Sequence, residues 1–362
     1  MPYILRLTPH ISHLILKKSL YSIKFVYIIG RMKIYNVVLS GGVGSRLWPL
    51  SRKSHPKQYL EIFNGRSLFE LTIKRNQNIT TDLMIIGNKD NEELSLRILD
   101  KLKAESIKVI EAIPRNTAAA IAFAAFAVDH EDDILIVTPS DHLIQRMDDY
   151  EDAIQRAVDL AKSDYIVTFG VEPTHPETGY GYIEHDGEKV LSFREKPNHI
   201  TAQDFIERGN FLWNSGMFCF KARVLLQELK QFEPEIYEKA KIAWDANING
   251  YLDEALSFAI PSNSIDYAVM ERSKRIKVVP AKFSWNDLGS FEALYDYFRS
   301  VGHPIDRNGN MIIGTDVYTA FVGLRDSIFV STPTANLILQ KEDSQEVKNV
   351  YNYLEKKRPE LT

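Results

Sequence analysis

Residues 33–51 read KIYNVVLSGGVGSRLWPLS, an apolar run of strand length followed at once by a glycine-rich loop. The apolar run predicts a buried strand that ends near Leu39. Glycines at positions 41, 42 and 44 let the backbone approach a ligand closely and point successive N–H groups at an anion. A loop of this kind suits phosphate binding, but it is also typical of a tight structural turn.

Two common phosphate-binding motifs do not match this loop. A P-loop requires Gly-Lys-Ser/Thr at its end, whereas Gly44 is followed by Ser45 and Arg46. A dinucleotide-binding fingerprint requires G-x-G-x-x-G, whereas the residue in the last position is Leu47. The loop therefore excludes both motifs without identifying its own ligand.

The same alternation of apolar runs and helical patterns continues beyond the loop. Strand-like runs occur at 37–39, 83–87, 134–138, 166–170 and 217–220. Helix-like spacing occurs at 67–79, 92–102, 117–129 and 150–162, and Asn116 or Thr117 is a candidate cap for the third helix. This order predicts an α/β fold: a mixed, mostly parallel sheet with helices on both faces and ligands beyond the carboxyl ends of the strands.

The chain divides into three parts. We expect residues 1–31 to be a basic extension outside the fold, either a start codon placed too far upstream or a targeting or membrane-surface segment. Residues 32–300 form the α/β domain. Residues 301–362 form a small, mainly β module with short runs at 311–313, 320–324, 327–331 and 336–339 and a final helix at 344–357.

Charge and composition exclude several classes of protein. Residues 1–31 hold five Lys or Arg and no Asp or Glu in a chain of net charge −4, so the remaining residues carry −9. Such an acidic body argues against broad nucleic-acid binding. No apolar run is long enough for a transmembrane helix. The single cysteine, Cys219, rules out an intramolecular disulfide and fits a reducing, cytoplasmic location.

A second segment makes the assignment of the glycine loop more specific. Residues 41–52 have the pattern G-G-x-G-x-R-L-W-P-L-S-R, and PKQYL follows at 56–60. Together they resemble the signature of mannose-1-phosphate guanylyltransferases, which belong to the sugar-nucleotidyltransferase superfamily. Further segments that resemble this family in the same order are PRNT (114–117), PSDH (139–142), TGYGYI (178–183), FREKP (193–197), WNSGMF (213–218), SIDYA (264–268) and WNDLGS (285–290).

The resemblance implies a Rossmann-like nucleotidyltransferase core and a defined reaction. A phosphate oxygen of α-D-mannose 1-phosphate attacks the α-phosphorus of GTP, giving GDP-mannose and pyrophosphate with no covalent enzyme intermediate. Such chemistry depends on positioning, cations and a metal ion, because two polyanions must be brought together. GTP and mannose 1-phosphate are the implied partners, with no nucleic acid and no membrane; a homodimer is one possible assembly.

On the nucleotide side, the resemblance implies that the amides of Gly41, Gly42 and Gly44 cradle the triphosphate. Arg46 would stabilise the departing pyrophosphate and Lys57 would neutralise the reacting phosphates. The nucleotide base or ribose would be held by Asn116 and Thr117. Without the resemblance, Arg46 and Lys57 would be interpreted as solvated surface residues, and Asn116 and Thr117 as a helix cap.

The metal and the sugar phosphate involve other segments. Asp141 and Asp287 are the implied ligands of Mg²⁺, with Mn²⁺ as an alternative, because Mg²⁺ is typically bound by one or two carboxylates plus substrate phosphates. The alternative role of each aspartate is to cap a helix or turn.

The resemblance places mannose 1-phosphate at Gly181, Glu195, Lys196 and Asn214. Glu195 accepts hydroxyl hydrogen bonds, Lys196 meets the phosphate and Asn214 both donates and accepts. The alternative is an exposed ion pair before a proline turn, together with a turn asparagine.

Two other functions stay open at this point. The same loop and aspartates would serve a related enzyme that uses another sugar phosphate or another base. A non-catalytic sensor on the same fold is the other alternative. Retention of Arg46, Lys57, Asp141 and Asp287 together argues against the sensor, which would not need the aspartates.

Overall fold

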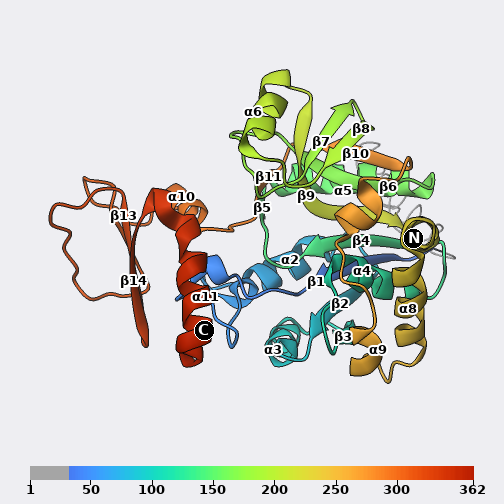
Figure 1. The fold of residues 1–362 in the computed structure, drawn as a ribbon, viewed down its shortest axis with the longest axis horizontal. Helices are drawn as coiled ribbons and strands as arrows, with labels where there is room; N and C mark the ends of the chain where they lie inside the picture. Colours follow the sequence, from blue (N-terminus) through green and yellow to red (C-terminus); the bar gives the residue numbers. More distant parts are fainter. Residues whose placement is uncertain (1–31) are drawn as a thin grey trace, which may run out of the picture.

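The computed structural model describes residues 32–362, so the prediction about residues 1–31 lies outside the described range. Most of this part is an α/β domain around one nine-stranded sheet (Figure 1). The strand order is β3-β2-β1-β4-β9-β6-β10-β8-β7. The strands are β1 (Ile34–Leu39), β2 (Asp82–Asn88), β3 (Ile107–Glu111), β4 (Ile134–Pro139), β6 (Ile166–Val171), β7 (Tyr182–Asp186), β8 (Lys189–Arg194), β9 (Phe211–Lys221) and β10 (Ile276–Pro280).

The sheet is mixed, as predicted. Strands β1, β2, β3 and β4 run parallel to one another, and β6 runs parallel to β10. Strand β9 lies antiparallel between β4 and β6, and β8 is antiparallel to β7 and β10. All strands of this sheet other than β8 and β9 therefore share one direction. Their carboxyl ends meet at one edge, where Asn214 of β9 pairs with Gly170 of β6.

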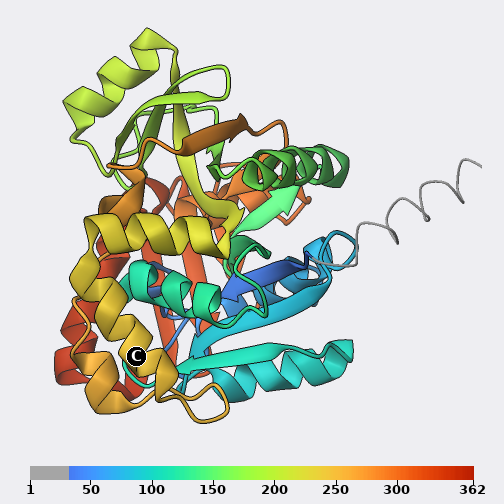
Figure 2. The same ribbon diagram turned by 90° about the vertical axis from the view of Figure 1, so that its right-hand side faces the viewer.

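Helices cover both faces of the sheet, which confirms the predicted layering (Figure 2). One face packs on α4 (Asn116–Phe126), α7 (Ala222–Phe232) and α8 (Pro234–Asp245). The other packs on α2 (Leu68–Asn76), α3 (Glu92–Leu102) and α5 (Met147–Lys162). Helices α6 (His199–Arg208) and α9 (Glu254–Phe258) lie at the periphery of these layers.

Side chains alternate between the two faces along the central strands, as strand geometry requires. Tyr35 and Val37 of β1 face α4, whereas Val38 faces α2. The cap predicted for the third helix was wrong. α4 begins at Asn116 itself, its N-cap position is Arg115, and no side chain caps it.

The C-terminal module packs on the glycine loop. It contains a three-stranded sheet, and the predicted strand at 320–324 is absent from it: Val322 there is 89% exposed, so that run has nothing to pack against. The indole of Trp48, just after the loop, donates to the Leu361 carbonyl at 2.8 Å. The module's elements are β12 (Met311–Ile313), β13 (Ser327–Thr332), β14 (Ala335–Gln340), η4 (Lys341–Glu346), α11 (Val347–Lys357) and η5 (Pro359–Leu361), and α10 (Phe291–Ser300), which precedes the module in the chain, packs in the same apolar cluster.

The module and the loop share one apolar core. Leu47 and Trp48 pack with Phe291 of α10 and Met311 of β12. The far end of the glycine loop is thereby held between the two parts of the molecule. None of the helices in residues 32–362 has the length and hydropathy needed to span a bilayer.

Candidate functional site

The glycine loop leaves the carboxyl end of β1 in a conformation that suits glycine. Gly42 and Gly44 have φ angles of 81° and 75°, in the left-handed region. A Cβ atom on Gly44 would lie 2.5 Å from the Cβ of Lys57. The backbone N–H of Lys57 donates to the Val43 carbonyl at 3.1 Å. The loop and the PKQYL segment therefore pack as one unit, in which position 44 has no room for a side chain.

This packing predicts the effect of replacing Gly44 by alanine. We expect Gly44→Ala to lower the free energy of unfolding by at least about 1–2 kcal/mol, the cost of placing an L-residue in left-handed backbone, with the clash against Lys57 adding to it. Chemical denaturation measures the change. Gly41→Ala is the matched control, because a Cβ there meets nothing within 4 Å. Equal stability of the two variants would contradict the explanation.

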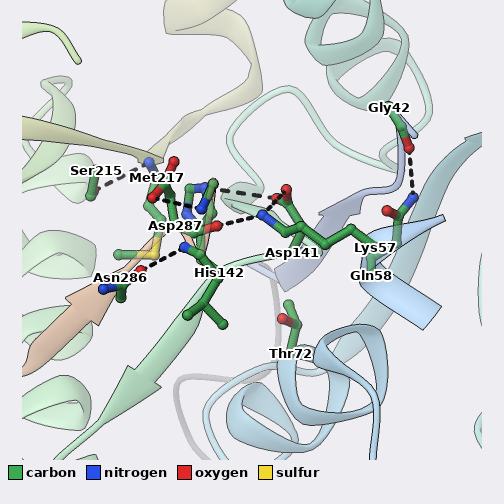
Figure 3. A network of polar contacts seen from close by, with 12 residues as sticks. Gly42, Lys57, Gln58, Thr72, Asp141, His142, Ser215, Met217, Asn286 and Asp287 are labelled. Atoms are coloured by element: carbon green, nitrogen blue, oxygen red, sulfur yellow. Dashed lines mark hydrogen bonds and ion pairs between the residues drawn. The ribbon is translucent and has the colours of Figure 1, made fainter. Parts of the chain in front are cut away.

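Lys57 lies at the centre of the site (Figure 3). Its side chain is nearly buried, and its ammonium nitrogen lies 2.8 Å from the carboxylate of Asp141. The same nitrogen donates a hydrogen bond to the backbone carbonyl of Asp287. Three residues predicted from separate segments thus meet: Lys57 from η2 (Lys57–Tyr59), Asp141 from the end of β4, and Asp287 from the end of β11 (Ser284–Asn286).

Electrostatics keep Asp141 ionised and His142 neutral. Burial raises the pKa of Asp141, but the neighbouring Lys57 ammonium favours the carboxylate, and the pKa lies below its usual value. Burial lowers the pKa of His142 despite the opposing Asp141 carboxylate. The indole N–H of Trp285 donates to Nδ1 of His142 at 3.2 Å, which places the remaining imidazole proton on Nε2. His142 therefore acts here as an oriented neutral ring.

Asp287 also borders a second hollow, of about 440 Å³, together with Arg46 and Tyr180. Its Oδ1 accepts the Tyr180 hydroxyl at 2.6 Å and the Gly289 N–H at 3.1 Å. Burial, and then the Asp287 carboxylate, raise the pKa of Tyr180, so that hydroxyl keeps its proton. Arg46 is exposed, and in the described range no carboxylate lies within ion-pairing distance of its guanidinium. The guanidinium is therefore free to bind an anion.

A cavity of about 490 Å³ lies between the glycine loop and α4. The predicted nucleotide-side residues Gly41, Gly42, Asn116 and Thr117 line it, and Asp141 closes one end. The Thr117 hydroxyl also accepts the Ile265 N–H at 2.9 Å, so it links α4 to the segment before Asp266. The cavity has the size of typical small-molecule sites.

The predicted sugar-phosphate residues form a neighbouring cluster. A Cβ on Gly181 would collide with Oε2 of Glu195, and the Asn214 N–H donates to the Gly181 carbonyl at 2.8 Å. The Lys196 ammonium lies 3.0 Å from Oε1 of Glu195. Oε2 of Glu195 is buried and has no hydrogen-bond partner in the described chain, so it is available to accept from a ligand hydroxyl.

Asp266 joins this cluster to the cavity, and sequence reasoning missed it. The Asn214 amide donates to Oδ1 of Asp266 at 2.9 Å, and Asp266 lines the cavity beside the glycine loop. Burial, followed by the charge of Glu195, raises the pKa of Asp266 to about 7. A lone aspartate at the start of a helical turn has no local pattern that marks it; its segment 264–268 was noticed only as part of the family resemblance.

Comparison with known proteins gives a consistent result. The family model described as "Nucleotidyl transferase" matches residues 35–303. Mannose-1-phosphate guanylyltransferase RfbM of Salmonella typhimurium is 38% identical over 355 aligned residues, which cover 90% of this chain and 73% of that protein.

Two solved structures are also similar. One is described as mannose-1-phosphate geranyltransferase from Thermus thermophilus; it is 27% identical with a TM-score of 0.77, over 90% of this chain and all of that one. The other is described as mannose-6-phosphate isomerase from Helicobacter pylori; it is 37% identical with a TM-score of 0.65, over 70% of this chain and all of that one.

Proposed function

The chain belongs to the nucleotidyl transferase family, and on that premise we propose that it transfers GMP from GTP to α-D-mannose 1-phosphate, releasing pyrophosphate. The observation that carries this proposal is the convergence on Lys57. Its ammonium joins Asp141 and the Asp287 backbone where the glycine loop meets the cavity. A cation in that position suits a reaction in which negative charge accumulates between two phosphates.

The nucleotide phosphates would bind along the glycine loop. The amides of Gly41, Gly42 and Gly44 donate to the triphosphate, and Lys57 faces the α-phosphate, where the bond forms. Arg46, free of carboxylate partners in the described residues, would bind the departing pyrophosphate with two parallel N–H bonds. Asn116 and Thr117, on the opposite cavity wall, would hold the ribose or base.

Mannose 1-phosphate would bind at the neighbouring cluster. Gly181 lets the backbone approach the sugar, and Oε2 of Glu195 accepts a hydroxyl proton. Asn214, held by Asp266, orients a second hydroxyl. Lys196 would bind the phosphate and hold it for attack in line with the leaving pyrophosphate. The attacking phosphate oxygen is already an anion, so neither a protein nucleophile nor deprotonation by His142 is required.

The reaction of this family involves a divalent metal ion, and the donor set fits Mg²⁺, with Mn²⁺ as an alternative. In the described residues, no group of three or more His, Cys, Asp or Glu side chains forms a metal site by itself. Mg²⁺ is typically bound by one or two carboxylates together with substrate phosphates. Oδ1 of Asp287 is taken by two donors, which leaves Oδ2, and the carboxylate of Asp141 is one-third exposed. Bound there, the ion would neutralise phosphate charge.

A matrix assay tests the function. We expect purified protein with Mg²⁺ to release pyrophosphate from GTP and mannose 1-phosphate faster than from any pairing of ATP, UTP or dTTP with glucose 1-phosphate. Pyrophosphate is followed by a coupled enzymatic assay and the sugar nucleotide by chromatography. Faster turnover of another pair would identify a related transferase instead. Conversion of mannose 6-phosphate to its ketose without nucleotide turnover would favour the isomerase activity named for one of the similar structures.

A homodimer and a cytoplasmic location stay predictions. The single cysteine is buried in β9, and burial raises the pKa of its thiol, so Cys219 is an unreactive part of the core. Sedimentation of the purified chain measures the assembly state.

A further inference from the structure

A pocket outside the candidate site contains an arginine that has no counterion. The pocket, of about 310 Å³, lies between α2, the short strand β5 (Leu143–Gln145) and the start of α5. None of its lining residues borders the nucleotide cavity or the hollow beside Asp287. Arg75 of α2 lines the pocket and is only 8% exposed. Burying a charge without a partner costs free energy, so the surroundings of this guanidinium indicate what the pocket binds.

The chain satisfies only part of the Arg75 guanidinium. Its Nη2 donates to the Thr72 hydroxyl at 3.1 Å, and its central carbon lies 5.2 Å from the centre of the Tyr150 ring. Its Nε is buried and has no hydrogen-bond partner in residues 32–362. A hydroxyl and an aromatic ring compensate a buried charge less than a carboxylate does. Burial lowers the pKa of Arg75, but an arginine side chain stays protonated in proteins, so the positive charge persists.

Neighbouring carboxylates do not supply the missing negative charge. On α2 itself, the carboxylate of Glu70 is engaged by the ammonium groups of Lys74 and Lys101, at 2.8 and 2.9 Å. Glu151 of α5 also lines the pocket, but it is exposed and forms no ion pair with Arg75 in the described part of the chain. An anion that neutralises Arg75 would therefore come from outside this part of the chain and enter through the pocket.

The other lining residues determine which anion the pocket suits. Much of the wall is apolar and consists of Leu71, Leu143, Ile144 and Met147. Lys74 is already paired with Glu70, and the exposed carboxylate of Glu151 repels a second negative charge. These features favour a singly charged carboxylate with an apolar body over a phosphate. Because a cavity of about 150 Å³ holds a benzene ring, the pocket has room for a small aromatic or branched carboxylate.

We propose that this pocket binds a small carboxylate with an apolar body, whose charged group pairs with Arg75 while the body packs against β5 and the start of α5. An arginine and a carboxylate form charge-assisted hydrogen bonds, which are stronger than those between neutral groups. The ligand thereby supplies the counterion that the described chain lacks. The site is separate from the nucleotide cavity, so the inference does not depend on the proposed reaction.

Benzoate and its neutral analogue benzamide test the proposal in the unchanged protein. We expect benzoate to bind with a Kd on the order of 1 mM, because a ligand with so few atoms gains limited binding energy. Benzamide has nearly the same shape without the charge, so it should bind at least about tenfold more weakly. Inorganic phosphate should not displace benzoate. Ligand-observed NMR titration measures all three. Equal affinity for benzoate and benzamide, or displacement of benzoate by phosphate, would overturn the proposal.

Two variants locate the bound carboxylate. Arg75→Met removes the charge and keeps an apolar side chain, so it should weaken benzoate binding at least about tenfold. Arg46→Met is the matched control, because it removes another guanidinium without a carboxylate partner, at the candidate site, and should leave benzoate affinity unchanged. Unchanged affinity in Arg75→Met would show that Arg75 only contacts Thr72 and Tyr150, and loss in Arg46→Met alone would place the anion at the candidate site; either result contradicts the proposal. If Arg75→Met does not fold, the comparison of benzoate with benzamide decides.

Discussion

Lys57→Met is expected to lower kcat for GDP-mannose formation by roughly 10²- to 10³-fold, the loss typical of removing one preorganised electrostatic group. The Lys57 ammonium is nearly buried between the Asp141 carboxylate and the Asp287 carbonyl. In the described residues, Lys57 is the only lysine or arginine that forms an ion pair with Asp141. His142 also lies near this carboxylate, but its lowered pKa keeps the ring neutral. Methionine fills the space of the lysine stem without its charge. Steady-state kinetics at saturating GTP and mannose 1-phosphate measure the effect.

The stability effect of this change can be separated from catalysis. Breaking a fully buried pair costs about 3–5 kcal/mol, but the Asp141 carboxylate is 32% exposed, so we expect a smaller loss. The double variant Lys57→Met/Asp141→Asn removes the unpaired charge and should regain stability without regaining turnover. Lys74→Met is the matched control, since Lys74 also forms a 2.8 Å ion pair, with Glu70, away from the site. Turnover of Lys57→Met within about threefold of the control would remove Lys57 from the catalytic role.

Asp287→Ala is expected to lower turnover by roughly 100-fold or more, as for other preorganised charged groups, with the fold intact. The substitution removes a proposed ligand of the divalent ion and the acceptor of the Tyr180 hydroxyl and the Gly289 N–H. The backbone carbonyl that binds Lys57 is retained. Because loss of a metal ligand weakens metal binding, the Mg²⁺ concentration for half-maximal activity should also rise.

Two further variants isolate the role of the Asp287 charge. Asp287→Asn keeps an oxygen for the Tyr180 hydroxyl and removes the negative charge, so it should share the metal defect while preserving local structure. Asp296→Ala changes another carboxylate that lines the same hollow as Asp287, and it should retain normal turnover. Near-normal activity of Asp287→Ala at low Mg²⁺ would exclude Asp287 as a metal ligand, while unfolding of Asp287→Ala alone would leave Asp287→Asn to decide.

Local patterns were sufficient for much of the fold. The strand before Gly41 and the helix at 92–102 depend on residue spacing within one element, and both appear as predicted. Strand direction could not be predicted from local patterns. The apolar run at 217–220 lies in β9, which is antiparallel to both β4 and β6. A buried run is equally apolar in either direction, so only the path of the whole chain decides it.

The residues of the candidate site also divide into those that the sequence indicates and those that only the structure reveals. Motif residues such as Gly44 and Lys57 could be proposed because their segments resemble the signature of a known family. Asp266 could not, since a single acidic residue at the start of a helix has no local signature. Its place in the site depends on burial and on neighbours such as Asn214, which lies 52 residues from Asp266.

The sequence by itself determined the α/β class, because apolar periodicity acts within a few positions, and its motifs identified the family by resemblance. Only the tertiary structure decided that Lys57 meets the backbone of Asp287, 230 residues away, and that Asp266 lines the same cavity as the glycine loop. The physical reason is that charge pairing and desolvation depend on distance in space, and strand order sets that distance.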